Sequence, residues 1–402
     1  MNSVPLRVSE AAPLTPQLVT ATRQLRVLTL TPFYPSAEDG SQGGFIADAL
    51  KSMDSGDVEN HVIAAQPFYR GRLHAINSAG SSRWATYFSV PGNLGLPTAG
   101  AFLAAGLLRS VRRMHRLRAF DLIHAHGALP CGHAASVIAG TLGIPFVISV
   151  HGLDVFATTQ SGSTAGAWFR RVSRRVYGSA RAVICISEKV REQLGTEFSA
   201  KARVIYNGVD AEMFRPGPES TSPLTVLSVG NLIPIKGHAL LLRAFRRILD
   251  QVPECSLEIF GDGPEQENLL RLAQQLGISD RVHFQGRQSR KIVSEAMRRC
   301  AVFALPSTYE GLGCVYLEAM ASAKPAVGCR GQGIEEIIAH GKNGFLISPG
   351  SEAELTGYLT SLLHNHELRR QMGTNARNLI LQRHTLSHQA RQLTETYREC
   401  SL

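Results

Sequence analysis

The sequence predicts an α/β protein with two doubly wound parallel sheets that follow one another along the chain. Short apolar runs typical of buried strands alternate with helix-length segments, a second alternation begins after a Pro- and Ser-containing stretch, and 402 residues suffice for two domains. The predicted divisions are a flexible tail at 1–24, a first domain at 25–215, a linker at 216–223, a second domain at 224–385 and a C-terminal helix at 386–402 that packs back towards the first domain.

The composition is that of a globular protein, with 44% hydrophobic and 18% charged residues. No run approaches the roughly 20 apolar residues of a membrane-spanning helix, and the first residues lack a secretory signal, so we expect a cytoplasmic protein. Seven cysteines, none in a Cys-x-x-Cys pair, predict reduced thiols in the core.

Strands of the first domain are predicted at 26–31, 120–126, 145–151, 182–187 and 203–208. The first of them is followed by a loop containing Gly40, Gly43 and Gly44, and then by a helix that begins near Phe45. Glycines between a strand and a helix let backbone N–H groups approach a phosphate, although Gly-Gly pairs are also common in plain turns.

Positive charge is concentrated in the first domain. The net charge is +10, and ten arginines lie between Arg109 and Arg181, mostly on helical segments at 98–117 and 168–177. This concentration predicts an acidic partner, which is an anionic membrane surface, a phosphorylated acceptor or nucleic acid. A solvated charged face explains the pattern equally well, and nucleic-acid binding is disfavoured by the lack of a recognition motif.

Several histidines follow the predicted strands. His151 and Asp154 stand at the carboxyl end of their strand, where open α/β sheets bind ligands, although Asp154 would also cap the next helix. His124 and His126 lie on one side of the strand at 120–126. No third ligand is evident beside them, so we interpret them as structural residues and not as a metal site.

Strands of the second domain are predicted at 224–229, within 257–264, and at 282–287, 301–305 and 325–328. The loop at 230–237 has a superficial likeness to a phosphate loop. It lacks the Gly-Lys-Ser/Thr core and is interrupted by a proline, which argues against a nucleoside triphosphatase.

The segment between the strands at 301–305 and 325–328 predicts a ligand site. Gly311 and Gly313 lie where a loop becomes a short helix, so backbone can approach a ligand there, and the first helical N–H groups have no intrahelical partners. Glu310 and Glu318 flank this anion site. Carboxylates repel phosphate but accept hydrogen bonds from the paired hydroxyl groups of a ribose or hexose. Alternatively, they are solvated helix-end carboxylates.

The spacing from Glu310 to Glu318 resembles the E-x7-E segment of family 4 retaining glycosyltransferases, which are group 1 enzymes with the GT-B fold. The segments 207–216 and 331–346 are similar to other parts of that family. The resemblance implies two Rossmann-like domains that face each other across a cleft, with a C-terminal helix that crosses back.

The resemblance also implies roles for individual residues. His151 is expected beside the transferred sugar, Glu310 at the sugar hydroxyls, Glu318 at the ribose and Lys236 at the diphosphate. The implied donor-binding residues are Gly43, Gly44, Asn231, Lys236, Arg287, Glu310, Gly311, Leu312, Gly313, Cys314, Val315 and Glu318. Asn231 stands where the family usually has an arginine, so one charge of the diphosphate clamp is missing, and Arg287 and Arg330 are candidates to supply it.

The implied reaction is the retaining transfer of a hexose-type sugar from a nucleoside diphosphate sugar to a carbohydrate or lipid-linked acceptor, in cell-envelope or extracellular polysaccharide or glycolipid assembly. No Asp-x-Asp occurs, so we expect no metal, and no cofactor besides the nucleotide-sugar co-substrate. The basic first domain suggests a peripheral place on the inner face of the membrane. The alternatives are a GT-B relative that acts as a sugar-nucleotide epimerase or phosphorylase and, less favoured, a basic nucleic-acid-binding protein.

Overall fold

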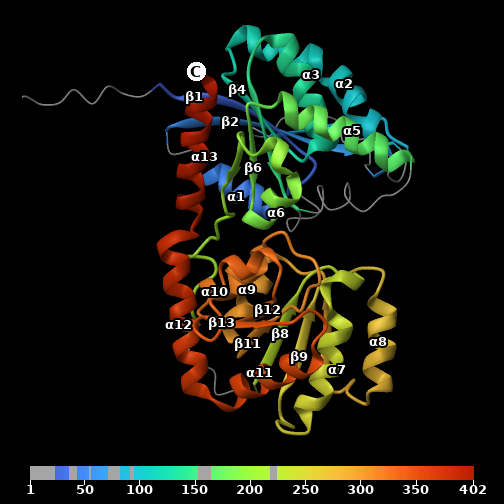
Figure 1. Ribbon diagram of the computed structural model, residues 1–402, viewed down its shortest axis with the longest axis vertical. Coiled ribbons are helices and arrows are strands. Elements are labelled where there is room, and N and C mark those ends of the chain that lie inside the picture. The colour runs from blue at the N-terminus through green and yellow to red at the C-terminus, as the bar shows by residue number, and fades with distance from the viewer. Residues whose placement is uncertain are drawn as a thin grey trace, which may run out of the picture.

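The computed structural model describes residues 23–35, 43–53, 56–70, 82–90, 95–152, 164–217 and 224–402. Two α/β units lie one above the other, and the last two helices run along one side of both (Figure 1). Of the predicted divisions, nearly all of the tail and most of the linker fall outside the described residues.

The first unit is a parallel sheet of seven strands in the order β3-β2-β1-β4-β5-β6-β7. The strands are β1 Leu25–Thr31, β2 Val58–Pro67, β3 Ser82–Tyr87, β4 Leu122–His126, β5 Phe146–Val150, β6 Ala182–Cys185 and β7 Ala202–Val204. Its helices are α1 Gly44–Met53, α2 Leu96–Leu117, α3 His133–Leu142, α5 Thr164–Ser179 and α6 Glu188–Leu194. The order reverses between β1 and β4, and the carboxyl ends of strands at such a point are where doubly wound sheets bind ligands.

The second unit repeats this plan with six parallel strands in the order β10-β9-β8-β11-β12-β13. The strands are β8 Thr225–Val229, β9 Ser256–Phe260, β10 Val282–Gly286, β11 Val302–Ala304, β12 Ala326–Cys329 and β13 Gly344–Ile347. Its helices are α7 His238–Leu249, α8 Gln266–Gln275, α9 Arg290–Arg299, α10 Cys314–Ala321, α11 Glu352–His364 and α12 His366–Arg383. Here the order reverses between β8 and β11.

The chain passes between the two units twice, and the two crossings are hydrogen-bonded to each other. The backbone N–H of Val209 donates to the carbonyl of His384 at 2.9 Å, and that of Leu386 donates back to Val209 at 3.2 Å. After this crossing, α13 Leu386–Ser401 buries Leu393 and Tyr397 against the first sheet. The returning helix and the two doubly wound sheets confirm the predicted fold class.

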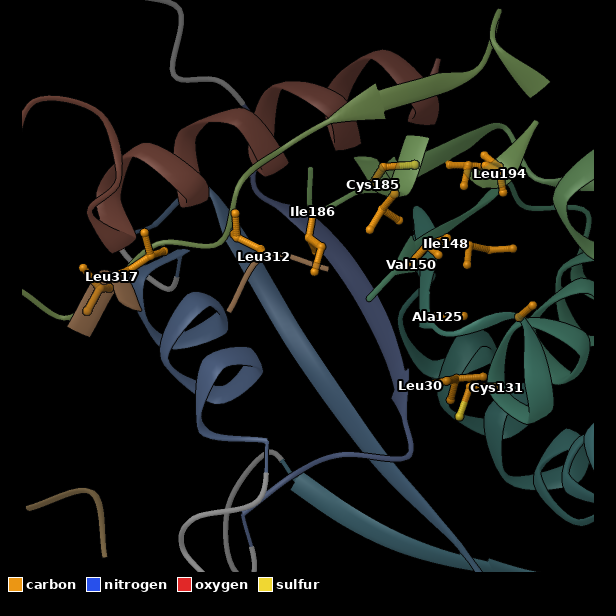
Figure 2. Close-up of a cluster of buried hydrophobic side chains, with 14 of the residues drawn as sticks. Leu30, Ala125, Cys131, Ile148, Val150, Cys185, Ile186, Leu194, Leu312 and Leu317 are labelled. Atoms are coloured by element: carbon orange, nitrogen blue, oxygen red, sulfur yellow. The ribbon is translucent and has the colours of Figure 1, made fainter. Parts of the chain in front are cut away.

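One hydrophobic core cluster continues from the first unit into the second. Leu312 and Leu317 belong to the same cluster as Ile148 and Ile186, and Figure 2 draws Leu312 facing Ile186 across the junction. Leu312 is fully buried, and burial of a leucine side chain contributes about 1.5–3 kcal/mol. The loop before α10 is therefore anchored by apolar packing on the first unit.

Candidate active site

The loops that follow the strands of the two units meet at the junction between them. The Ser187 hydroxyl, at the end of β6, donates a 2.6 Å hydrogen bond to the carbonyl of Gly311. A Cβ atom placed on Gly152 would lie only 3.0 Å from the Cα of Gly311. The expected reaction-centre loop at His151–Gly152 thus lies directly against the loop that carries Glu310.

Glu310 and Lys236 are brought together as an ion pair. The Lys236 ammonium contacts the Glu310 carboxylate, and the two side chains are 15% and 13% exposed. The Glu310 backbone N–H donates to the Gln332 side-chain oxygen at 3.0 Å, which fixes the loop. Glu310, the expected acceptor for sugar hydroxyls, and Lys236, the expected phosphate-binding cation, therefore neutralise each other in this structure.

Glu318 contacts a residue that the sequence analysis missed, Arg290. Arg290 Nη2 lies 3.3 Å from Glu318 Oε1, and the same guanidinium also contacts the carboxylate of Asp48 on α1. Burial raises the pKa of Glu318 to about 7, although Arg290 opposes the rise. Nothing in the sequence pairs these residues, because Arg290 is separated from Glu318 by 28 positions and from Asp48 by 242.

Helix α10 begins at Gly313, whose φ of 82° favours glycine, and no side chain caps it. Burial raises the pKa of the Cys314 thiol to about 12, and Asn207 donates to its sulfur at 3.3 Å. The thiol is therefore neutral at physiological pH. Val315 is half-buried, and Leu312 lies in the core, so any contact of this turn with a ligand is made mainly by backbone.

Gly43 and Gly44 open α1 in tight surroundings. Gly43 has a φ of 71°, and a Cβ there would collide with the carbonyl of Phe33. A Cβ on Gly44 would lie 2.8 Å from Arg290 Nη1. Gly43 thus requires glycine, and Gly44 gives space to a side chain of the second unit.

His151 is the end of a row of three histidines, of which His124 and His126 are buried and His151 is half-buried. His126 Nδ1 lies 3.0 Å from His151 Nε2, and the His124 ring, 4.3 Å from that of His126, hydrogen-bonds Ser149 at 2.8 Å and Tyr397 at 2.6 Å. Burial lowers the pKa of His151 to about 4 and that of His124 to about 3. The imidazoles are therefore neutral at pH 7 and act as hydrogen-bonding groups.

The contact of His151 with His126 is one that the sequence did not indicate. Even so, no group of three His, Cys, Asp or Glu side chains in the described part of the chain is arranged to hold a metal ion. A cavity of about 20 Å³ adjoins the row, enough for about one water molecule.

The remaining predicted donor residues lie around the same loops. Asn231 is exposed at the end of β8. Arg287 pairs with Asp262, with 2.8 Å between Nη2 and Oδ1, and Arg330 is exposed after β12. Asp154 falls outside the described residues.

A basic surface lies on α5 of the first unit, away from these loops. Arg170, Arg171, Arg174 and Arg175 line a groove of about 540 Å³ there. The exposed rings of Phe68 and Phe88 stack on each other near the start of α2, and Phe102 contacts Phe88 edge to face. Within the described ranges, no helix is long and apolar enough to cross a membrane.

Comparisons with known proteins place both halves of the chain in one group of enzymes. Residues 209–379 match the family model of glycosyl transferases group 1, and residues 46–213 match that of glycosyltransferase family 4. An uncharacterized glycosyltransferase of Methanocaldococcus jannaschii is 31% identical over 258 residues, which cover 64% of this chain and 69% of that protein.

One further relative and one solved structure of similar fold carry descriptions of what they act on or bind. A GDP-mannose-dependent α-(1-6)-phosphatidylinositol monomannoside mannosyltransferase of Mycolicibacterium smegmatis is 30% identical over 235 residues, 53% of this chain and 60% of that protein. The crystal structure of HepE from Anabaena in complex with UDP-glucose aligns with a TM-score of 0.72, covering 94% of this chain and all of that one at 22% identity. At that identity the structural match shows the fold alone.

Proposed function

The chain belongs to the family 4, group 1 glycosyltransferases, and we propose that it moves a hexose-type sugar from a nucleoside diphosphate sugar to an acceptor hydroxyl with retention of configuration. The observation that carries this is the place of the two carboxylates. Glu310 lies in the loop before α10 and Glu318 lies within the helix, each beside a cation, and the Glu310 loop packs directly on His151–Gly152. Carboxylates accept hydrogen bonds from hydroxyl groups, and cationic side chains bind the negatively charged oxygens of a diphosphate.

Donor binding would exchange the partners of the existing ion pair. Sugar hydroxyl groups would donate to Glu310, and the Lys236 ammonium would turn to the diphosphate. Lys236, the free N–H groups at the start of α10 and the backbone at Gly43–Gly44 would then stabilise the charge that develops on the leaving group. Glu318 would accept from the ribose hydroxyls.

Retention is proposed by analogy with the family. The anomeric carbon–oxygen bond to the diphosphate breaks, the acceptor oxygen bonds to the anomeric carbon on the same face, and the acceptor proton passes to the departing phosphate oxygen. His151, neutral at pH 7, would hydrogen-bond the transferred sugar and not exchange a proton with it. Its contact with His126 holds the ring in place.

We propose that the reaction needs no metal ion, because Lys236 and helix N–H groups can neutralise the leaving group. Turnover should be unchanged in excess chelator. Loss of activity that manganese restores would contradict this part of the proposal.

For the acceptor, we propose a lipid-linked or otherwise anionic molecule at the inner face of the membrane, in envelope or extracellular polysaccharide or glycolipid assembly. The arginine groove on α5 and the exposed aromatic cluster near α2 support it, since basic residues bind anionic headgroups and aromatic rings favour the interface. The relative that acts on a phosphatidylinositol monomannoside is in keeping with such an acceptor. Sedimentation with liposomes should show binding that depends on anionic lipid, and equal binding to neutral liposomes would remove this support.

Product analysis tests the proposed function. The purified protein would be incubated with UDP-, GDP- and ADP-sugars and a lipid extract, and the products analysed by mass spectrometry. We expect a glycosylated acceptor and a free nucleoside diphosphate from one donor. Conversion of the donor to another sugar nucleotide without acceptor would indicate an epimerase, and release of a sugar 1-phosphate in the presence of phosphate would indicate a phosphorylase.

A further inference from the structure

Arg290 connects the two units at the candidate donor site. It is the first residue of α9, yet its guanidinium reaches Asp48 on α1 of the first unit and Glu318 on α10 of the second. It also lies over the Phe214 ring, 5.5 Å from its centre, and the side chain is only 21% exposed. Two carboxylates contact this mostly buried charge and offset part of the cost of removing it from water.

The start of α1 is shaped around this guanidinium. Any side chain at Gly44 would place a Cβ 2.8 Å from Arg290 Nη1 and 3.0 Å from its Cδ. The glycine backbone and the arginine therefore border the same space. A ligand phosphate that approaches the backbone at Gly44 would meet the arginine as well.

The charges around this space indicate that binding a diphosphate there requires a second cation besides Lys236. Asp48, Glu310 and Glu318 are three acidic groups, and the basic groups that contact them are Lys236 and Arg290. A bound diphosphate adds at least two negative charges. Lys236 alone cannot offset these charges, and the position where the family resemblance implies an arginine holds the neutral Asn231.

We propose that Arg290 binds the diphosphate of the donor. In the structure it is held by Glu318 and Asp48. When the ribose hydroxyls donate to Glu318, the Nη2 group that contacts this carboxylate is released to bind a phosphate oxygen. A guanidinium presents parallel donors that match two phosphate oxygens. This inference rests on the proposed function and deepens it, because it assigns the second cation of the donor clamp to an element that the sequence did not indicate.

Titration calorimetry with matched ligands tests this role. Dissociation constants of UDP, GDP and ADP would be measured first, and the tightest of them would then be compared with its own nucleoside, measured by competition. Arg290→Gln should weaken diphosphate binding by about 10- to 100-fold, the usual effect of a lost charge-assisted contact, and leave nucleoside binding within about twofold. Arg299→Gln is the matched control, because Arg299 lies on the same helix and pairs with Glu258 on the surface.

A structural role predicts a different pattern. If Arg290 only positions Glu318, the diphosphate and the nucleoside should weaken together in Arg290→Gln, and that result would overturn the proposal. Equal diphosphate binding by wild type and variant would overturn it too. Should Arg290→Gln fail to fold, Arg290→Lys keeps one charge and should still lose diphosphate affinity selectively. Failure of the wild-type protein to bind any diphosphate would count against the proposed function itself and, with it, this inference.

Discussion

Replacing Glu318 by glutamine should stabilise the protein and weaken donor binding at the same time. Burial raises the pKa of Glu318 to about 7 from an ordinary value of 4.5, so ionisation of this carboxyl is less favourable in the folded chain than in the unfolded one. Above pH 7 the carboxylate is charged in both states, and the shift costs about 3 kcal/mol of folding free energy. Glutamine has nearly the same shape and no charge, and therefore avoids that cost.

The size of this stabilisation depends on pH. As the pH falls from about 7 to about 4.5, the folded chain takes up the proton while the unfolded chain is still ionised, so the wild type gains stability relative to the variant. The advantage of Glu318→Gln should therefore be about 3 kcal/mol at pH 8 and less than about 1 kcal/mol at pH 5. At pH 8 this corresponds to a rise of roughly 3–5 °C in the unfolding midpoint of a chain of this length.

Thermal unfolding of both proteins from pH 5 to pH 8.5 measures this difference. Glu399→Gln serves as the control, since this exposed carboxylate pairs with Arg203 on the surface and its removal should change stability little at any pH. Midpoints of wild type and Glu318→Gln that run parallel across the pH range would refute the argument, because they would mean that Glu318 is not buried as a high-pKa carboxyl.

Three further substitutions test other parts of the site. Lys236→Gln should lower kcat by about 100-fold or more, because the leaving group loses a cation and Glu310 loses its partner. Steady-state kinetics with the identified donor would measure this, and an unchanged kcat would contradict the role of Lys236 in binding the diphosphate. Leu312→Ala should cost about 2–5 kcal/mol in denaturant unfolding, since it opens a cavity where the two units meet; a loss below 1 kcal/mol would mean that the junction is loosely packed. Tyr397→Phe should cost about 1 kcal/mol by removing its bond to His124 and leave KM unchanged, and a raised KM would instead connect α13 with donor binding.

The sequence predicted most strands of the fold because their residues are mostly apolar. The strands at 26–31, 120–126, 145–151 and 182–187 correspond to β1, β4, β5 and β6, which are buried on both faces. By contrast, β2 and β3 were missed. Their sequences contain Glu59, Asn60 and His61 or Arg83 and Trp84, polar or bulky residues that a strand nearer the sheet edge tolerates.

The candidate site was predictable where its residues are close in sequence. The loop and helix from Glu310 to Glu318 form one local unit, so their spacing alone placed both carboxylates beside the start of α10. The residues that contact them come from distant elements. Arg290 is one arginine among many in a basic chain, and its partner Asp48 lies in another unit, so only the fold brings them together.

The contacts within the histidine row were also not predictable from the sequence. The spacing of His124 and His126 places them on one side of β4, but the contact of His126 with His151 depends on the pairing of β4 with β5. The bond from His124 to Tyr397 further depends on the return of α13 to the first sheet. Neither is encoded in a local pattern, since each joins segments that are far apart in the chain.

The most direct test of the central claim is calorimetric titration of the wild-type protein and Glu318→Gln with UDP-, GDP- and ADP-sugars. The account predicts that one donor binds the wild type and binds the variant about 10- to 100-fold more weakly, through the loss of a charge-assisted hydrogen bond to the ribose. No binding of any donor, or equal binding by both proteins, would contradict the assignment of this junction as a nucleotide-sugar site.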